Sequence, residues 1–416
     1  MFTIVKKKIT IIGGGITGVV IAIYLCEKYD VTIYEGGNSL GGVLSDINHK
    51  NNFFLNGCHY LNVKSDWYKK VHSIIKKDLD IFNYTTHSFT EYLDHQTISS
   101  NKFECPVIKK IKFKTTNKLK NITLSDRFDL YDKDISIFLK DIVRKLKINP
   151  DDLIYDNAIN FQLDRITSIE DENRIKKLKE KQIYDQIYAL ESKKLKIFHK
   201  AALPINGYNV IFEKFKNYLI SKNVKIFCGK KVIPIWENKH LKLNYNKKII
   251  DSEKIIWTAN PVGLIYKYFL KPLESKSFRV KQLDFEYDNN FFKNIYIQVF
   301  SKNTSIFRIF LYKSSGKQKI SVECSDFMKE HFDEIIKKLV KILISFKIGF
   351  IKSNLKFIGL STSSRHDICT VHDFDMISKF RNSIKKSNLI TSDWEVYGRD
   401  AKIKNLLIKL KREKII

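Results

Sequence analysis

Three glycines spaced Gly-x-Gly-x-x-Gly lie between an apolar run and an apolar, helix-like segment near the start of the chain. Lys8–Ile12 has the length and apolar character of a buried strand, Ile16–Lys28 is typical of a buried helix, and Asp30–Glu35 is again typical of a strand. A strand, a helix and a second strand within about 30 residues predict a βαβ unit and hence a parallel sheet. This unit restricts the fold class to α/β more strongly than any other feature of the sequence.

The spacing of these glycines suits the diphosphate of a dinucleotide. Gly13 permits a tight turn after the strand, Gly15 lets a diphosphate approach the backbone, and Gly18 lets the helix pack closely on the strand. The first residues of the helix, Ile16 and Thr17, then present backbone amides to the phosphates at the positive end of the helix dipole. The sequence therefore favours a dinucleotide site over a glycine-rich turn without a ligand.

An acidic residue and a second pair of glycines follow this unit. The Glu35 carboxylate ends the second strand, where it can accept hydrogen bonds from ribose hydroxyls and repel a 2′-phosphate. With Gly41-Gly42 after it, the segment resembles the FAD-dependent amine oxidase superfamily, which includes protoporphyrinogen oxidases, phytoene desaturases and UDP-galactopyranose mutases. The resemblance implies that Gly41 and Gly42 bring a second loop against the phosphates of FAD. Val43 departs from the family, because many members have Arg there.

Two further segments resemble the mutase branch of that superfamily. Asn56–Tyr60 is similar to a Gly-x-His segment that passes near the isoalloxazine ring, which implies a flavin-binding and catalytic role for His59. A packed histidine without a catalytic role is the alternative. Leu203–Tyr208 resembles a Pro-x-x-Gly-Tyr element that precedes a helix. Val224–Val232 resembles the strand pair that flanks the adenine, which implies that the backbone of Val232 touches the adenine edge.

The resemblance is fainter near the C-terminus. Members of the superfamily have a glycine-containing strand end near the ribitol, followed by a helix that caps the flavin. Leu389–Trp394 corresponds to that strand end, so the resemblance implies that Asp393 binds the ribitol and that Gly398 lets the chain approach the flavin. Ser392 stands where the family has the glycine.

The order of elements predicts an α/β fold with a Rossmann-like FAD-binding domain around a parallel sheet, an antiparallel-sheet substrate domain and a helical cap. The cap rests on charged, helix-like stretches such as Asp134–Leu146 and Ile169–Ile197, and the antiparallel sheet rests on strand-like runs such as Ile295–Phe300. The predicted boundaries are 1–64 and 201–272 for two segments of the FAD-binding domain, 65–200 for the mainly helical cap, 273–330 for the substrate domain, and 331–416 for the return to the FAD-binding domain with a C-terminal helix.

Composition limits the kinds of partner that the chain is expected to bind. The net charge of +29 comes from lysines spread along the chain, which favours a compositional bias over a nucleic-acid site. The six cysteines show neither C-x-x-C nor zinc-ligand spacing, so we predict a cytoplasmic protein without a disulfide or metal site. The uncharged stretch Ile9–Cys26 resembles an export signal, but the three successive glycines within it argue against an integral membrane segment. Ala401–Arg412 is amphipathic and basic, which favours a last helix on the flavin domain over a peripheral membrane contact.

Three functions fit these features. The first is an FAD-dependent oxidoreductase acting on a small organic substrate. The second is a non-redox flavoenzyme of the UDP-galactopyranose mutase type, which needs arginines to hold the diphosphate of a nucleotide sugar. The third is a dinucleotide-binding protein without catalysis. The substrate, the electron acceptor and the oligomeric state are not specified by the sequence. The candidate arginines, none of them in a family motif, are Arg165, Arg174, Arg279 and Arg308.

Three adjacent residues have side chains typical of a catalytic cluster, but their spacing argues against one. Arg365, His366 and Asp367 are adjacent in sequence, and side chains of adjacent residues rarely converge. We therefore interpret them as a loop.

Overall fold

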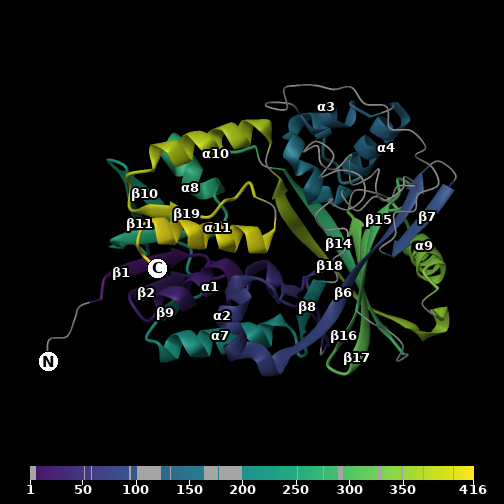
Figure 1. Ribbon diagram of the computed structural model, residues 1–416, viewed down its shortest axis with the longest axis horizontal. Coiled ribbons are helices and arrows are strands. Elements are labelled where there is room, and N and C mark those ends of the chain that lie inside the picture. The colour runs from purple at the N-terminus through teal and green to yellow at the C-terminus, as the bar shows by residue number, and fades with distance from the viewer. Residues whose placement is uncertain are drawn as a thin grey trace.

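The protein folds around two large sheets, which Figure 1 shows side by side, with the parallel sheet and its helices on the left and the larger sheet on the right. This arrangement confirms the α/β fold with both parallel and antiparallel sheets. The computed structural model describes residues 6–50, 52–57, 59–92, 95–100, 123–131, 133–163, 177, 199–250, 252–274, 276–288, 294–326, 329–347, 350–368, 370–396 and 398–416.

The smaller of the two is a five-stranded sheet in which every neighbouring pair is parallel. Successive residues of its central strands enter opposite cores, because side chains alternate across a strand: Ile11 packs in one core and Ile12 in the other. Burial on both faces explains the nearly continuous apolar character of these strands. In spatial order they are β19 (Leu389–Thr391), β13 (Lys254–Trp257), β1 (Lys8–Ile12), β2 (Asp30–Tyr34) and β9 (Lys225–Phe227).

Helices cover both faces of this sheet. The basic C-terminal helix buries Ile403, Leu406 and Leu410 in the core that also holds the first helix. Within the part of the chain that the structure describes, none of the helices has the length and apolar character needed to cross a bilayer. One face carries α1 (Ile16–Leu25), α2 (Asp66–Ile75), α7 (Tyr208–Ser221) and α11 (Arg399–Arg412); the other carries α8 (Val262–Phe269), α10 (Val371–Ser383) and a small sheet of β10 (Ile233–Glu237), β11 (His240–Tyr245) and β12 (Lys248–Ile250).

The larger sheet has nine strands and is antiparallel except where β6 pairs with β15. One face packs on α9 (Phe332–Ser345), where Leu339 meets Ile309 and Val322. The other face carries polar side chains such as Gln282 and Lys319, which contact the backbone of residues 53–57. In spatial order the strands are β18 (Leu355–Ile368), β14 (Lys276–Tyr287), β17 (Lys317–Ser325), β16 (Ile306–Ser314), β15 (Ile295–Phe300), β6 (Leu79–Tyr92), β8 (His199–Pro204) and β5 (Leu61–Asn62), with β7 (His95–Ser100) paired to β6.

A small helical cap lies above the nine-stranded sheet in Figure 1. Thr123 and Asp126 form a capping box that starts its first helix. The cap consists of α3 (Leu124–Phe128), α4 (Lys133–Arg144), η3 (Pro150–Asp152) and η4 (Tyr155–Phe161), and the remaining short elements are η1 (Gly42–Leu44), β3 (Ile47–His49), β4 (Asn52–Phe54), η2 (Lys76–Asp78) and η7 (Lys352–Asn354).

Two predicted segments differ from the structure. The described part of residues 65–200 contains strands as well as helices, and the 14 residues of β6 pair with β8 and β15. Residues 331–416 do not return at once to the parallel sheet, because β18 pairs with β14 along its length. That strand includes the backbone of residues 365–367, so the expectation of a loop there is wrong. The predicted helix Ile169–Ile197 falls outside the described residues, and the domain boundaries remain a prediction.

Candidate functional site

The glycine-rich turn between β1 and α1 is held by tight packing at two of its glycines. Gly13 has a φ of +105°, and a Cβ there would lie 2.8 Å from Thr258 Oγ1 and 2.9 Å from the Ala259 backbone nitrogen. A Cβ on Gly18 would collide with the carbonyl oxygen of Gly13. Both positions therefore require glycine for the packing of turn, helix and neighbouring strand end.

The middle glycine of the turn is different, because no heavy atom of the described residues lies within 4 Å of the Cβ position of Gly15. Gly15 is the N-cap of α1, and no side chain caps this helix end. Ile16 and Thr17 form the first turn, where backbone amides have no partner within the helix. Open space in front of a positive helix end is the arrangement that a diphosphate requires. The residues at this turn therefore fit the phosphates of a dinucleotide.

The acidic residue at the end of β2 faces this turn. Glu35 Oε2 accepts a hydrogen bond of 2.5 Å from the Gly14 backbone amide, and Oε1 accepts one of 2.6 Å from the Gly37 amide. Each carboxylate oxygen has a second lone pair, so both can also accept from ribose hydroxyls. The structure thus brings Glu35 to the turn, as the sequence predicts, and adds a role in fixing the turn itself.

The second glycine pair lies against the first turn. The Gly41 amide donates to the Gly14 carbonyl at 3.0 Å, and a Cβ on Gly42 would lie 3.5 Å from the Cα of Gly15. Both residues have positive φ angles, of 128° and 56°, which favour glycine. Val43 follows with 69% of its side chain exposed. The two loops that the sequence placed at the phosphates are therefore adjacent, with an uncharged residue where many relatives have Arg.

The segment that follows β9 borders the site at the end of β2. The Lys230 amide donates to the Glu35 carbonyl at 2.9 Å, and the Gly229 amide donates to the Gly37 carbonyl at 2.6 Å. Val232 comes two residues later and is buried in the core that contains Tyr34. The structure thus places Val232 near the end of β2, and its contact with adenine stays a prediction.

The segment around His59 lies between the two large sheets. The Tyr208 hydroxyl at the start of α7 donates to the His59 carbonyl at 3.0 Å, and Arg399 at the start of α11 donates to the Tyr60 carbonyl. The His59 side chain is half-buried. Two helix starts therefore fix the backbone on either side of this residue, while Cys58 lies outside the described residues.

A buried glutamine that the sequence did not single out holds the segment before His59. The side chain of Gln282 in β14 is fully buried; its Nε2 donates to the Leu55 carbonyl at 2.9 Å and its Oε1 accepts from the Gly57 amide at 2.9 Å. The Tyr312 hydroxyl accepts from the Leu55 amide at 3.0 Å. Because Asp284 Oδ1 accepts a further bond from Gln282 at 2.8 Å, the amide is fixed in orientation. The substrate-side sheet thus positions the His59 segment.

A second residue that the sequence analysis did not single out is an aspartate whose side chain lies at the start of α7. Asp46 accepts hydrogen bonds from the Tyr208 amide at 3.0 Å and the Asn209 amide at 2.8 Å, so it caps the helix. Gly207 before them has a φ of +86°, which brings the chain to this carboxylate. Burial raises the pKa of Asp46 to about 6, although the two amides and the nearby Lys319 act in the opposite direction.

This raised pKa predicts a measurable pH dependence of stability. Because the pKa of Asp46 is higher in the folded chain than in the unfolded chain, the folded chain binds more protons between about pH 4 and pH 6. The free energy of unfolding should therefore fall as the pH rises through this range, by up to about 3 kcal/mol. We expect Asp46→Asn to remove this fall, since Asn keeps an acceptor for one amide but does not titrate. Urea unfolding of both chains from pH 4 to pH 7 tests this, and parallel stability curves would show that Asp46 does not titrate as inferred.

The C-terminal candidate is already engaged by protein groups. Asp393 accepts hydrogen bonds from Lys409 and from Asn405 Nδ2, the latter at 2.8 Å, and pairs with Arg381 at 3.2 Å. Burial alone would raise the pKa of Asp393, but Lys409, Asn405 and Arg381 lower it overall. The carboxylate therefore joins α10, α11 and the end of β19, and its contact with ribitol stays a prediction.

The candidate arginines do not gather at one place. Arg279 forms an ion pair of 3.2 Å with Asp326, and Arg308 pairs with Glu323 on the neighbouring strand. Arg165 and Arg174 lie outside the described residues. The two described candidates, Arg279 and Arg308, therefore form separate ion pairs and no common diphosphate clamp.

Comparisons with known proteins agree with this geometry. Residues 11–77 match the NAD(P)-binding Rossmann-like domain family. The fold is similar to that of a UDP-galactopyranose mutase, with a TM-score of 0.67, 11% identity and coverage of 100% of this chain and 94% of that chain. It is also similar to a putative protoporphyrinogen oxidase from Exiguobacterium sp. 255-15, with a TM-score of 0.62, 12% identity and coverage of 98% and 99%. Cyclohexylamine oxidase from Brevibacterium oxydans IH-35A gives a TM-score of 0.61, 8% identity and coverage of 98% and 100%.

The chain has the fold shared by these proteins. No curated protein sequence matches it. The resemblance read from the glycine motifs is thus confirmed at the level of the fold.

Proposed function

We propose that the chain binds FAD at the glycine-rich turn and is an FAD-dependent oxidoreductase acting on a small organic substrate. The observation that carries the proposal is the open space at Gly15, in front of the uncapped start of α1 and beside Gly42. Glu35 would hold the adenosine ribose and the amides of Ile16 and Thr17 the diphosphate. The fold is similar to that of two oxidases over nearly the full length of both chains, which supports FAD rather than NAD as the cofactor.

The remaining roles follow from the position of each residue. Bound FAD would supply a ring that accepts a hydride or electrons, while the protein orients the substrate and excludes water. We propose that His59 contacts the flavin or the substrate, that Val232 borders the adenine, and that Asp393 lies near the ribitol. Tyr208 and Gln282 would act indirectly, by fixing the backbone of the His59 segment.

Purification of the full chain tests the proposal directly. We expect a yellow protein, or an apoprotein that takes up one equivalent of FAD and quenches its fluorescence, while NAD does not compete. Reduction of the bound flavin by a substrate, followed by reoxidation with oxygen or a quinone, would support the oxidoreductase. A colourless chain that takes up no FAD on reconstitution would refute it and leave only a dinucleotide-binding protein without catalysis.

The acidic residue offers a graded test of the same site. We expect Glu35→Ala to weaken FAD binding by about 1–3 kcal/mol, because the ribose loses a charged hydrogen-bond partner and the Gly14 amide loses its acceptor. Glu35→Gln keeps one acceptor oxygen and should show a smaller loss. Fluorescence titration of FAD measures both, and an unchanged dissociation constant for Glu35→Ala would contradict the ribose assignment.

A second candidate function is a non-redox flavoenzyme of the UDP-galactopyranose mutase type. It is favoured by the TM-score of 0.67 to a reduced mutase, with the whole chain covered. The two candidates differ in stoichiometry. Isomerisation of a UDP-sugar only after reduction of the flavin, without net consumption of reductant, would support the mutase over the oxidoreductase. For either function we propose a cytoplasmic protein with a small-molecule or nucleotide-sugar partner.

A further inference from the structure

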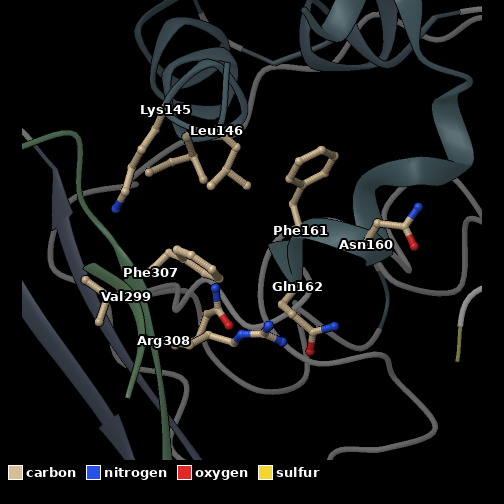
Figure 2. Close-up of a pocket in the computed structure, with 10 residues that line it drawn as sticks. Lys145, Leu146, Asn160, Phe161, Gln162, Val299, Phe307 and Arg308 are labelled. Carbon is tan, nitrogen blue, oxygen red and sulfur yellow. The ribbon is translucent and has the colours of Figure 1, made fainter. Parts of the chain in front are cut away.

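A pocket separates the helical cap from the nine-stranded sheet (Figure 2). Its roof comes from the end of α4 and from η4, which contribute Leu146 and Phe161. Its floor comes from β15 and β16, which contribute Gln298, Phe307 and Arg308. Apolar and aromatic walls with a few polar groups are typical of sites for small molecules.

The floor of the pocket continues toward the proposed flavin site. Four polar side chains form a row across the sheet, because Gln298 pairs with Arg308, Arg308 with Glu323, and Glu323 with Gln282 on successive strands. Direct partners lie on the same face, about 5 Å apart. Arg308 is therefore about 10 Å from Gln282, which holds the segment before His59.

One buried amide at the floor of the pocket has an unused donor. Gln298 is 5% exposed, and its Oε1 accepts a hydrogen bond of 2.6 Å from the Tyr296 hydroxyl. Its Nε2 has no partner among the described residues, and Gln298 lines the pocket. This amide nitrogen can therefore donate to an acceptor oxygen on a ligand in the pocket.

The two cationic side chains that line the pocket are bound by protein groups. The guanidinium of Arg308 pairs with Glu323, whose side chain is 2% exposed. The Lys145 ammonium donates to the carbonyls of Ser301 at 3.0 Å and Ile306 at 2.6 Å, and Figure 2 shows its side chain running from the helix toward the strands. Burial also lowers the pKa of Lys145 to about 7. Both cationic side chains of the described lining are thus bound by protein atoms, Arg308 by a carboxylate and Lys145 by backbone carbonyls.

We propose that this pocket holds the substrate of the enzyme by an uncharged carbonyl group, which accepts from Gln298 Nε2, while the apolar body of the substrate packs between Phe161 and Phe307. The role in catalysis rests on the proposed function. An isolated carboxylate or ammonium would lose its hydration without meeting a free counter-charge. The pocket therefore selects a neutral group over an amine or a diphosphate.

Three ligands of nearly equal shape test this selection: benzamide, benzoate and benzylammonium. We expect benzamide to bind the full-length protein with a dissociation constant at least about tenfold lower than that of either charged ligand. Ligand-observed NMR titration at pH 7 measures all three. Benzoate or benzylammonium binding as tightly as benzamide, or no binding of any of them, would overturn the proposal.

Two substitutions locate the binding. Gln298→Leu should raise the dissociation constant of benzamide about fivefold, the effect of one lost hydrogen bond. Gln318→Leu is the matched control, because Gln318 is equally buried in the same sheet but lies with Ile320 on the α9 face. If Gln298→Leu does not fold, Leu146→Phe fills the pocket from the cap and should abolish benzamide binding. Benzamide affinity that is unchanged in the folded variant would overturn the assignment.

FAD binding, followed in the same samples by fluorescence quenching, separates this inference from the proposed function. FAD binding without benzamide binding would overturn the pocket assignment alone. Benzamide binding without FAD binding would overturn the proposed oxidoreductase and, with it, the role of the pocket as a catalytic substrate site.

Discussion

Gly15→Val is expected to weaken FAD binding at least about 100-fold while the chain stays folded. The Gly15 backbone has φ of −67° and ψ of 175°, which valine adopts readily, and its Cβ position meets no protein atom. The folded chain without ligand should therefore tolerate the substitution. The added methyl groups occupy the space that the diphosphate needs, so several charge-assisted hydrogen bonds to backbone amides are lost together.

The control for this variant is Gly263→Val, at an exposed position of α8 where a Cβ also meets nothing within 4 Å. It introduces the same side chain away from the site and should leave the dissociation constant of FAD unchanged. Fluorescence titration gives both constants, and circular dichroism gives the fold. Tight, stoichiometric FAD binding by folded Gly15→Val would place the cofactor elsewhere and remove the basis of the proposed function.

The glycine site could be predicted from the sequence because its determinants are local. Gly18 packs on the carbonyl of Gly13 in the same turn, and the apolar runs on either side give the strand and helix directly. Glu35 lies 21 residues from Gly14, within a single βαβ unit. When interacting residues are this close in the sequence, their spacing can be recognised from the order of residue types.

Other parts of the site depend on partners that lie far apart in the sequence, and no local sequence pattern predicts these contacts. Asp46 caps a helix more than 160 residues away, and Gln282 binds a backbone amide 225 residues away. The strand β18 was not predicted because its serine and threonine run has no apolar alternation, yet it pairs with β14 along its length. Asp393 matched a family position, but its bonds to Lys409 and Asn405 depend on how α11 packs. Such interactions arise only when the tertiary fold brings the elements together.

The second large effect is expected for Gln282→Leu, which should reduce the free energy of unfolding by about 2–5 kcal/mol. Leucine has nearly the same volume but no polar atoms, so the Leu55 carbonyl and the Gly57 amide both lose their partner in a fully buried site. Each such group costs about 1–3 kcal/mol when it is left unpaired. Asp284 also loses a donor, which adds to the loss.

Gln318→Leu is again the matched control, because its Oε1 has no hydrogen-bond partner among the described residues and its removal should cost little. Urea unfolding compares the two variants, and hydrogen exchange at the Gly57 amide reports the loop itself. We expect exchange at Gly57 to accelerate in Gln282→Leu and not in Gln318→Leu, since only the former removes its acceptor. If both variants lost the same stability and Gly57 exchanged equally in each, Gln282 would be one packing residue among many. The position of the His59 segment would then depend on other contacts, among them those of Tyr208 and Arg399.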